Sequence, residues 1–123
     1  MESNDNNTTL QTLKVAVGKF VKDRDWIKYH TARNLAESIS IEASELLELF
    51  QWSLNEDQAS LAAESPKLGR VEEELADVVM YCVGLANATG IDVAKAIFSK
   101  LARNEKKYPV QRYKGTYSKP KGD

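Results

Sequence analysis

Apolar residues recur at helical spacing in two long segments of the chain, residues 35–52 and 71–89. Within each segment they fall mostly three or four positions apart, which places them along one side of an α-helix. The two stripes consist of Leu35, Ile39, Leu46 and Leu49, and of Val71, Leu75, Val78, Cys82 and Leu85. Strand-like alternation of apolar and polar residues is absent from the sequence. The sequence therefore predicts an all-α fold in which two helices bury these stripes.

Four carboxylates lie on or beside the two stripes. With about 100° of rotation per residue, Glu42 falls within the first stripe and Glu45 at its edge. Glu74 falls at the margin of the second stripe, and Asp77 lies just beyond it. A carboxylate inside a core stripe has to be neutralised by a proton, a partner or a metal. Four converging carboxylates with few cations nearby favour a hard, oxygen-seeking ion, namely Mg²⁺ with Mn²⁺ as a substitute.

Capping and helix-breaking residues divide the chain into four main helices. The expected helices run from Thr8 or Thr9 to near Asp25, from Arg33 to about Leu54, from Pro66 to Gly90, and from Asp92 to about Tyr108. Residues 26–32 form a connector, and residues 55–65 are expected to be a short helix or a loop. The predicted organisation is a polar tail over residues 1–8, a helical domain over residues 9–109 and a basic tail over residues 110–123.

Composition limits the class of protein. The chain has 123 residues, a 42% hydrophobic share and a net charge of −1, which indicate one globular domain without a field that recruits nucleic acid or an anionic membrane. No apolar run approaches the ~20 residues of a membrane span, and the N-terminus lacks the features of a signal peptide. The single cysteine, Cys82, is interpreted as a small core residue and excludes an internal disulfide. We expect a cytoplasmic protein that binds neither a nucleic acid polymer nor a membrane.

The fourth predicted helix carries a second unusual pattern. Its apolar side is defined by Val93, Ile97 and Leu101, yet Lys100 and Asn104 project along that same side. A lysine at a core edge often extends its ammonium to water, which is the alternative interpretation. Beside four carboxylates, however, an inward lysine and asparagine indicate an anionic ligand that also forms hydrogen bonds, because lysine neutralises phosphate as a point charge.

Together these residues resemble the all-α nucleoside triphosphate pyrophosphohydrolases, the group that contains MazG and the dimeric dUTPases. The similarity is greater still to the small MazG-like enzymes typified by dCTP pyrophosphatase. It covers residues 23–109. Its main motif is Glu-x-x-Glu followed after 28 residues by Glu-x-x-Asp. The other matching segments are Arg24-Asp25-Trp26, His30, Arg33-Asn34-Leu35, residues 42–52, residues 73–81, and Ser99-Lys100 through Asn104 to Tyr108-Pro109. Two positions depart from that subgroup. Ala32 stands where a proline is frequent, and Val17 stands where some members carry a histidine that faces the base.

The resemblance implies a four-helix bundle and hydrolysis of a nucleoside triphosphate between its α- and β-phosphates, to a monophosphate and pyrophosphate. Glu42, Glu45, Glu74 and Asp77 would hold Mg²⁺ on the phosphates, and any one of them could activate the attacking water. Glu45 is the candidate that we prefer for this base. Lys100, Asn104 and Tyr81 would bind the phosphates or the sugar. The favoured substrates would be dCTP-like or modified nucleotides, which describes a house-cleaning enzyme of the nucleotide pool.

Base recognition is assigned to two tryptophans. Trp26 and Trp52 match base-contacting positions of the subgroup, and stacking on an aromatic ring is worth roughly 1–3 kcal/mol per base. Each could instead be an ordinary core residue. His30, the only histidine, is interpreted as a structural or surface residue in the connector.

Three other classes of protein share some of these features with a pyrophosphohydrolase. A di-iron bundle expects Glu-x-x-His pairs, and neither acidic motif contains a histidine. A helical interaction module would not require acids on core stripes, and a nucleotide sensor without catalysis would usually lack one of the four. A chain of this size leaves apolar helix edges exposed, so we expect a homodimer or homotetramer.

Overall fold

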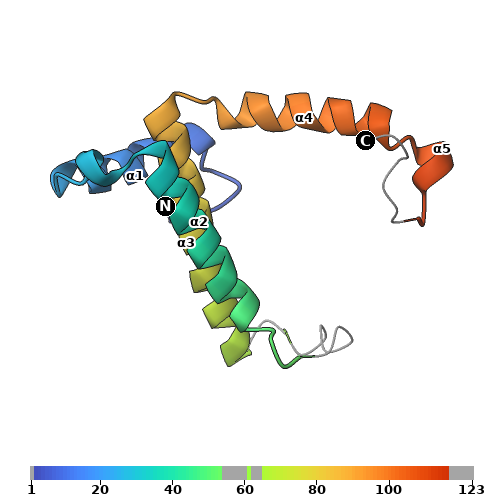
Figure 1. Cartoon of the computed structure of the whole chain (residues 1–123), viewed down its shortest axis with the longest axis horizontal. Coiled ribbons are helices and arrows are strands. Elements are labelled where there is room, and N and C mark those ends of the chain that lie inside the picture. Colours follow the sequence, from blue (N-terminus) through green and yellow to red (C-terminus); the bar gives the residue numbers. More distant parts are fainter. Residues whose placement is uncertain (1, 54–60, 62–64, 117–123) are drawn as a thin grey trace. The chain divides into compact units, whose positions relative to one another are not determined.

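The computed structural model describes residues 2–53, 61 and 65–116. Over these residues the chain is helical and forms no strand, which confirms the predicted all-α fold (Figure 1). The elements are α1 (Leu10–Asp23), the 3₁₀-helix η1 (Ile27–Tyr29), α2 (Ala32–Glu48), α3 (Pro66–Thr89), α4 (Val93–Lys107) and α5 (Val110–Tyr113). The segment 55–65, for which the sequence predicts a short helix or a loop, lies almost wholly outside the described residues.

Three of these helices begin at caps that the sequence predicts, namely Thr9, Ser65 and Asp92, and α2 begins one residue before the predicted Arg33. The side-chain oxygens of their N-cap residues accept hydrogen bonds from backbone N–H groups in the first turn, in the pairs Thr9–Thr12, Thr31–Asn34, Ser65–Lys67 and Asp92–Lys95. At the other end of α3, Gly90 adopts φ 75°, a left-handed conformation that glycine reaches without steric cost. Short-range chemistry therefore sets most of the helix boundaries.

The second helix ends earlier than the sequence predicts. It stops at Glu48, whereas the predicted helix reached Leu54, which lies outside the described residues. Residues 49–53 continue as turns, in which the Phe50 N–H bonds to the Leu47 carbonyl at 2.9 Å and the Ser53 N–H bonds to the Phe50 carbonyl at 3.1 Å. These i→i+3 bonds are tighter than those of an α-helix. Trp52 is therefore carried by a turn and not by α2.

The helices form two units, Met1–Gly90 and Ile91–Asp123, and each is described by itself. In the first unit, α3 packs along α2 and α1. A β-carbon at Gly84, near the C-terminal end of α3, would lie 3.6 Å from Leu35 Cδ2, near the start of α2. At the opposite end, Lys67 of α3 reaches Ser53, just beyond α2. The two helices are therefore antiparallel.

The core of the first unit is small. Its buried hydrophobic side chains are Val21 of α1, Leu35 of α2, and Val83 and Ala86 of α3. The expectation that Cys82 is a core residue is wrong, because this side chain is exposed. Among the described residues of the unit, α2 and α1 make the most extensive contacts with α3, and these contacts leave Cys82 exposed. Two of the five residues of the predicted α3 stripe, Leu75 and Cys82, are exposed in a single chain.

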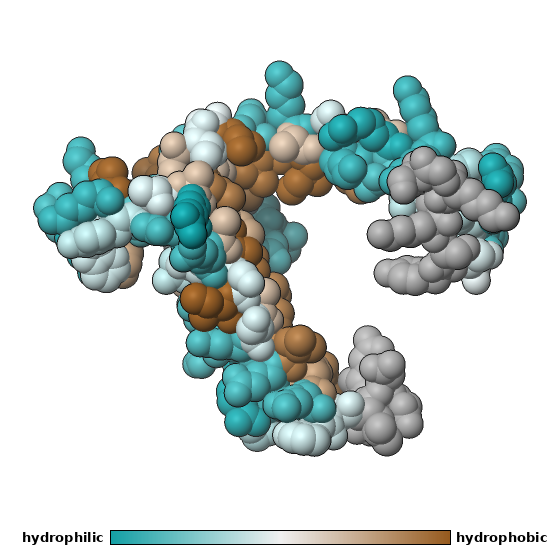
Figure 2. Space-filling view, in the orientation of Figure 1, coloured by the Kyte–Doolittle hydropathy of each residue, from teal (hydrophilic) through white to brown (hydrophobic). Residues whose placement is uncertain are grey.

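Large apolar side chains also lie on the surface of both units. In the first unit Ile41 is 59% exposed and Leu47 is 69% exposed, and in the second Phe98 is 72% exposed. Figure 2 shows hydrophobic surface in brown between teal hydrophilic regions.

Among the described residues, no single helix is long and apolar enough to cross a membrane. The pair α3 and α4 meets that criterion when the two helices are taken together, by length and composition only.

In the second unit, α4 is followed by the short helix α5, which the sequence analysis did not anticipate in the basic tail. The rings of Tyr108 and Tyr113 meet edge to face, with centroids 5.4 Å apart. Pro109 stands between α4 and α5 and ends α4 as the sequence predicts. An aromatic contact therefore holds α5 against the end of α4.

Candidate metal centre and neighbouring pocket

Three carboxylates converge between α2 and α3. One oxygen each from Glu42, Glu45 and Glu74 lies within 4.8 Å of the other two. Because Glu42 and Glu45 are three residues apart on α2, both reach the same side of that helix, and antiparallel packing brings Glu74 of α3 opposite them. The facing predicted from helical geometry therefore brings these three acids to one place.

Two of these carboxylates have an oxygen hidden from solvent. Glu42 Oε2 and Glu74 Oε2 are buried, and within the described part of the chain neither has a hydrogen-bond partner. Burial raises the pKa of Glu42, and the negative charges of Glu45, Asp77 and Glu74 raise it further. Burial likewise raises the pKa of Glu74, with added contributions from the charges of Glu45, Asp77 and Glu73. An unpaired, buried carboxylate is costly, so these oxygens require a proton or a cation.

Asp77 lies one turn after Glu74 and is half-buried. Its charge acts on both Glu42 and Glu74, but the three-carboxylate group of the described residues does not include it. Asp77 therefore belongs to the electrostatic surroundings of the group. The residues fit a hard divalent cation, because all the donors are carboxylate oxygens and two of them lack any other partner.

The remaining predicted phosphate and sugar ligands lie on two elements. Tyr81 follows Asp77 by one turn of α3 and is half-buried. Lys100 and Asn104 lie one turn apart on α4, where Lys100 is exposed and Asn104 is half-buried. They belong to the second unit, so their joining the acids of the first unit stays a prediction.

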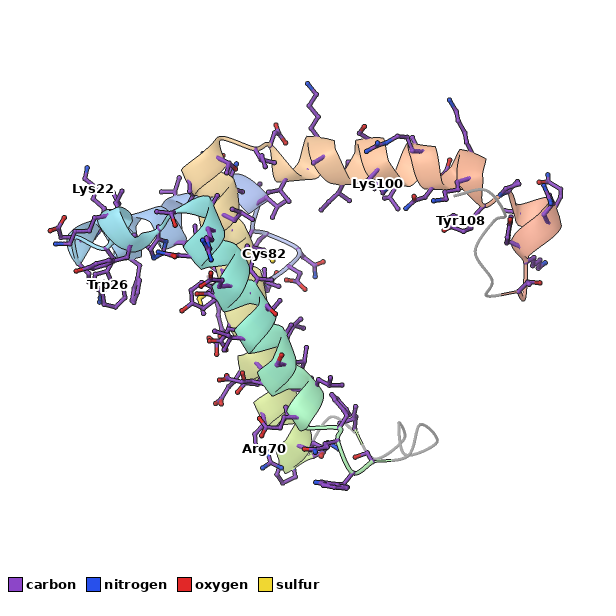
Figure 3. The ribbon with its side chains drawn as sticks, in the orientation of Figure 1. Lys22, Trp26, Arg70, Cys82, Lys100 and Tyr108 are labelled. Carbon is purple, nitrogen blue, oxygen red and sulfur yellow. The ribbon has the colours of Figure 1, made fainter. Side chains whose placement is uncertain are left out.

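The two tryptophans lie beyond opposite ends of α2. Trp26 precedes the helix and meets the Phe20 ring of α1 edge to face, with centroids 5.8 Å apart. Trp52 follows the helix and is 90% exposed. The 17 residues of α2 span about 25 Å at 1.5 Å per residue. In Figure 3, Trp26 is labelled beside α1. Arg70 is labelled near the N-terminal end of α3, which lies beside the C-terminal end of α2.

A pocket that the sequence analysis missed lies between α1, η1 and α3. Its volume is about 260 Å³, and apolar side chains of Val17, Val21 and Ile27 form part of its lining. His30 and Asn87 contribute polar groups to the lining. The Nδ2 of Asn87 donates a hydrogen bond to the Lys14 carbonyl at 3.0 Å. His30, interpreted from the sequence as structural or surface, is half-buried here.

Two glycines inside helices leave room for this pocket. Gly18 of α1 and Gly84 of α3 both line it, and a β-carbon at Gly84 would lie 3.8 Å from His30 Nδ1. Glycine in a helix interior is destabilising, so its presence there was the available sequence signal for a close approach or a cavity. Gly84 follows Glu74 by ten residues, about 15 Å along α3.

Comparison with known proteins gives consistent matches. Residues 37–121 match the model of the MazG-like family. The chain is 34% identical over 111 residues to rat (Rattus norvegicus) dCTP pyrophosphatase 1, which covers 90% of this chain and 65% of the rat protein. It is 33% identical over 102 residues to the human (Homo sapiens) dCTP pyrophosphatase 1, which covers 83% of this chain and 60% of the human protein. This chain therefore spans less than two thirds of the length of these relatives.

A solved structure matches over almost its whole length. It is the crystal structure of a pyrophosphatase from Archaeoglobus fulgidus, with a TM-score of 0.75 and 39% sequence identity. The match covers 88% of this chain and 99% of the archaeal chain. The agreement in sequence and structure extends well beyond the two acidic motifs.

Proposed function

This chain belongs to the MazG-like family, and from that premise we propose that it is a nucleoside triphosphate pyrophosphohydrolase. It would cleave the bond between the α- and β-phosphates and release a nucleoside monophosphate and pyrophosphate. The observation that carries the proposal is the group formed by Glu42, Glu45 and Glu74, with two buried oxygens that lack a partner among the described residues. Relatives named dCTP pyrophosphatase and pyrophosphatase support the same reaction class.

The carboxylates would share the work of holding a cation and activating water. Glu42 and Glu74, with their half-buried side chains, would ligate Mg²⁺ or Mn²⁺ together with Glu45, and Asp77, one turn after Glu74, is proposed as a fourth ligand. A divalent cation held by these residues would stabilise the negative charge on the phosphate oxygens during hydrolysis. Glu45 is exposed and so reaches solvent at the edge of the group, where it can orient a water and take its proton.

The substrate would extend from the acids in two directions. Lys100 would neutralise the leaving pyrophosphate, while Asn104 and Tyr81 would donate to phosphate or sugar oxygens. The nucleoside would lie toward the pocket lined by Val17 and His30. A flat heterocycle suits a pocket with apolar walls and a few polar groups. By analogy with the relatives, dCTP-like or modified nucleotides are the proposed substrates, in the cytoplasm.

A second copy of the chain would bring the two tryptophans to one base. Within one chain, Trp26 and Trp52 lie beyond opposite ends of a helix about 25 Å long, too far apart to stack on the same ring. If α2 helices of two copies pack antiparallel about a two-fold axis, Trp52 of one copy approaches Trp26 of the other. Exposed Ile41 and Leu47 of α2 supply apolar surface for such a contact. We therefore propose a homodimer or a homotetramer built from it.

Mixing two variants that each bind the nucleotide weakly tests this arrangement at a substrate concentration well below their KM. A hybrid of Trp26→Ala and Trp52→Ala chains would contain one site with both tryptophans intact, since each site takes one from each copy. We expect co-refolded mixtures to regain about a quarter of the wild-type activity, because half of the dimers are hybrids and each has one complete site. Mixtures no more active than the separate variants would contradict a shared site.

The reaction itself is tested by its products in ¹⁸O-labelled water. A panel of canonical and modified nucleoside triphosphates should release pyrophosphate with Mg²⁺, and attack at the α-phosphorus should place the label in the monophosphate. Calcium should support binding with poor turnover. Release of inorganic phosphate with accumulation of diphosphate would contradict cleavage at the α–β bond. Nucleotide binding without any turnover would instead favour a binding or regulatory module, and indifference to both ions would favour an interaction module.

A further inference from the structure

Lys67 joins the end of the α2 segment to the start of α3. Its Nζ donates to Ser53 Oγ at 2.7 Å and lies 4.8 Å from the centroid of the Phe50 ring. The lysine and the serine are 14 residues apart in sequence, so this contact joins the segment after α2 directly to the first turn of α3. The hydrogen bond is partly buried, which reduces competition from water.

Helix stability does not explain this lysine. Lys67 is the second residue of α3, where the positive end of the helix dipole disfavours a cation. The start of α3 is already capped by the Ser65 hydroxyl and opens with Pro66, both favourable there. The benefit of Lys67 therefore lies in its contacts with Phe50 and Ser53.

Those two contacts bracket Trp52. Phe50 lies two residues before the tryptophan and Ser53 directly after it, so Lys67 holds the chain on both sides. The indole itself is 90% exposed and gains little packing of its own. Trp52 also lies on turns beyond the last residue of α2, where the helix no longer fixes its direction. An exposed ring that must meet a ligand binds more tightly when its backbone is fixed beforehand.

We propose that Lys67 is a positioning residue that holds Trp52 in the orientation in which it meets the nucleoside, an inference that rests on the proposed function. Lys67→Met removes the charge and the hydrogen bond but keeps the length of the side chain. It should raise KM about two- to tenfold, the range expected for ordering one side chain, and leave kcat unchanged. Lys67→Arg keeps a cation over Phe50 and a donor for Ser53, so it should restore the wild-type KM.

The first measurement observes Trp52 without substrate. In a Trp26→Phe background Trp52 is the only tryptophan, and its fluorescence anisotropy decay reports local motion. Lys67→Met and Ser53→Ala should each increase the amplitude of fast depolarisation. Lys95→Met is the matched control, because Lys95 is an exposed lysine in the first turn of α4, and it should leave the decay unchanged. An unchanged decay in Lys67→Met would overturn the proposal.

The second measurement is a double-mutant cycle on KM with the natural Trp26. Because Lys67 acts through Trp52, Lys67→Met should add nothing once Trp52 is alanine. An equal rise in KM in the presence and absence of Trp52 would show that Lys67 contacts the substrate itself, and would overturn the positioning role. Circular dichroism and melting curves show that each variant is folded. If the wild type neither binds nor hydrolyses nucleotides, the proposed function fails, whereas the anisotropy experiment still decides whether Lys67 holds Trp52.

Discussion

At the scale of single residues, Glu42 and Glu74 stand out because each carries a buried oxygen without a partner among the described residues. We expect Glu42→Gln, Glu45→Gln, Glu74→Gln and Asp77→Asn each to lower kcat about 10²- to 10⁴-fold, the range typical of a positioned catalytic group. Pyrophosphate release measures kcat, and circular dichroism verifies the helical fold.

Matched controls for these variants lie on the same two helices. Glu48 of α2 and Glu72 of α3 are exposed acids that are not members of the carboxylate group found among the described residues. Glu48→Gln and Glu72→Gln should keep kcat within about twofold of the wild type, since solvent-exposed charges interact weakly. A loss at either position as large as that of Glu42→Gln would show that the assignment of faces to the acids is wrong.

The raised pKa values of Glu42 and Glu74 also predict how stability depends on pH without metal. A carboxyl whose pKa is raised on folding binds its proton more tightly in the folded state. Its favourable contribution is therefore complete below the ordinary pKa of 4.5 and is lost as the pH rises through the raised pKa. The Tm of the metal-free protein should rise as the pH falls from 7 toward 5. Calorimetric melting at each pH measures this change.

Two changes should weaken that pH dependence. Glu42→Gln is neutral at every pH, so it should show a higher Tm at pH 7 without metal and a flatter curve. Saturating Mg²⁺ should raise the Tm of the wild type at pH 7. At a Mg²⁺ concentration a hundredfold above Kd, binding should stabilise the folded state by about 2.7 kcal/mol. A Glu42→Gln curve parallel to that of the wild type would show that this carboxyl does not titrate in the expected way.

At the scale of helices, what the sequence predicted correctly is local. Thr9, Ser65, Asp92 and Gly90 set helix boundaries through contacts with residues a few positions away, and such signals are visible in the sequence. The facing of the acids follows from the same helical period. The early end of α2 was missed because no glycine or proline marks it, and turns take over after Glu48.

What the sequence did not predict depends on which helices lie against each other. Cys82 belongs to an apolar stripe, yet its side chain is exposed although α1 and α2 both pack along α3. The pocket beside Gly84 arises only when α1, η1 and α3 meet, so His30 could not be placed in it beforehand. Periodicity identifies an apolar face but does not identify the element that covers it.

Two glycines of α3 give a paired prediction about this pocket. Gly84 lines the pocket, and a β-carbon there makes only ordinary contacts, whereas a β-carbon at Gly69 would have nothing within 4 Å. Both Gly84→Ala and Gly69→Ala should stabilise the helix by about 0.5–1 kcal/mol. Only the change at Gly84 should raise KM, because only that methyl group enters the space proposed for the nucleoside. Melting curves and steady-state kinetics separate the two effects.

A larger side chain sharpens this comparison. Gly84→Leu would fill more of the pocket of about 260 Å³ and should raise KM further, while Gly69→Leu should leave it unchanged. Equal KM values for the wild type and both Gly84 variants would show that the substrate does not use the pocket.

At the scale of the whole molecule, the proposed site draws on both units of the chain. The carboxylates belong to Met1–Gly90, whereas Lys100 belongs to Ile91–Asp123. A pyrophosphohydrolase has to neutralise a leaving group that carries several negative charges. The described acids near the carboxylate group add negative charge to the site and do not offset it. In this proposal Lys100 of the second unit supplies the positive charge, since the described side chains that act on Glu42 and Glu74 are acids.

Lys100→Ala tests this joint site by comparing two ligands. Loss of the ammonium should weaken binding of the triphosphate far more than binding of the monophosphate, because its effect grows with the phosphate charge nearby. Trp52→Ala should instead weaken both alike, since both ligands carry the base. Lys95→Ala, at an exposed lysine of the same helix, should change neither. Calorimetry with Ca²⁺ in place of Mg²⁺ measures the affinity of each variant and of the wild type for both ligands with little turnover. The loss at Lys100 should deepen as the metal concentration falls. Equal losses for both ligands would place Lys100 at the nucleoside or in the support of the fold, and the second unit would then not supply the cation.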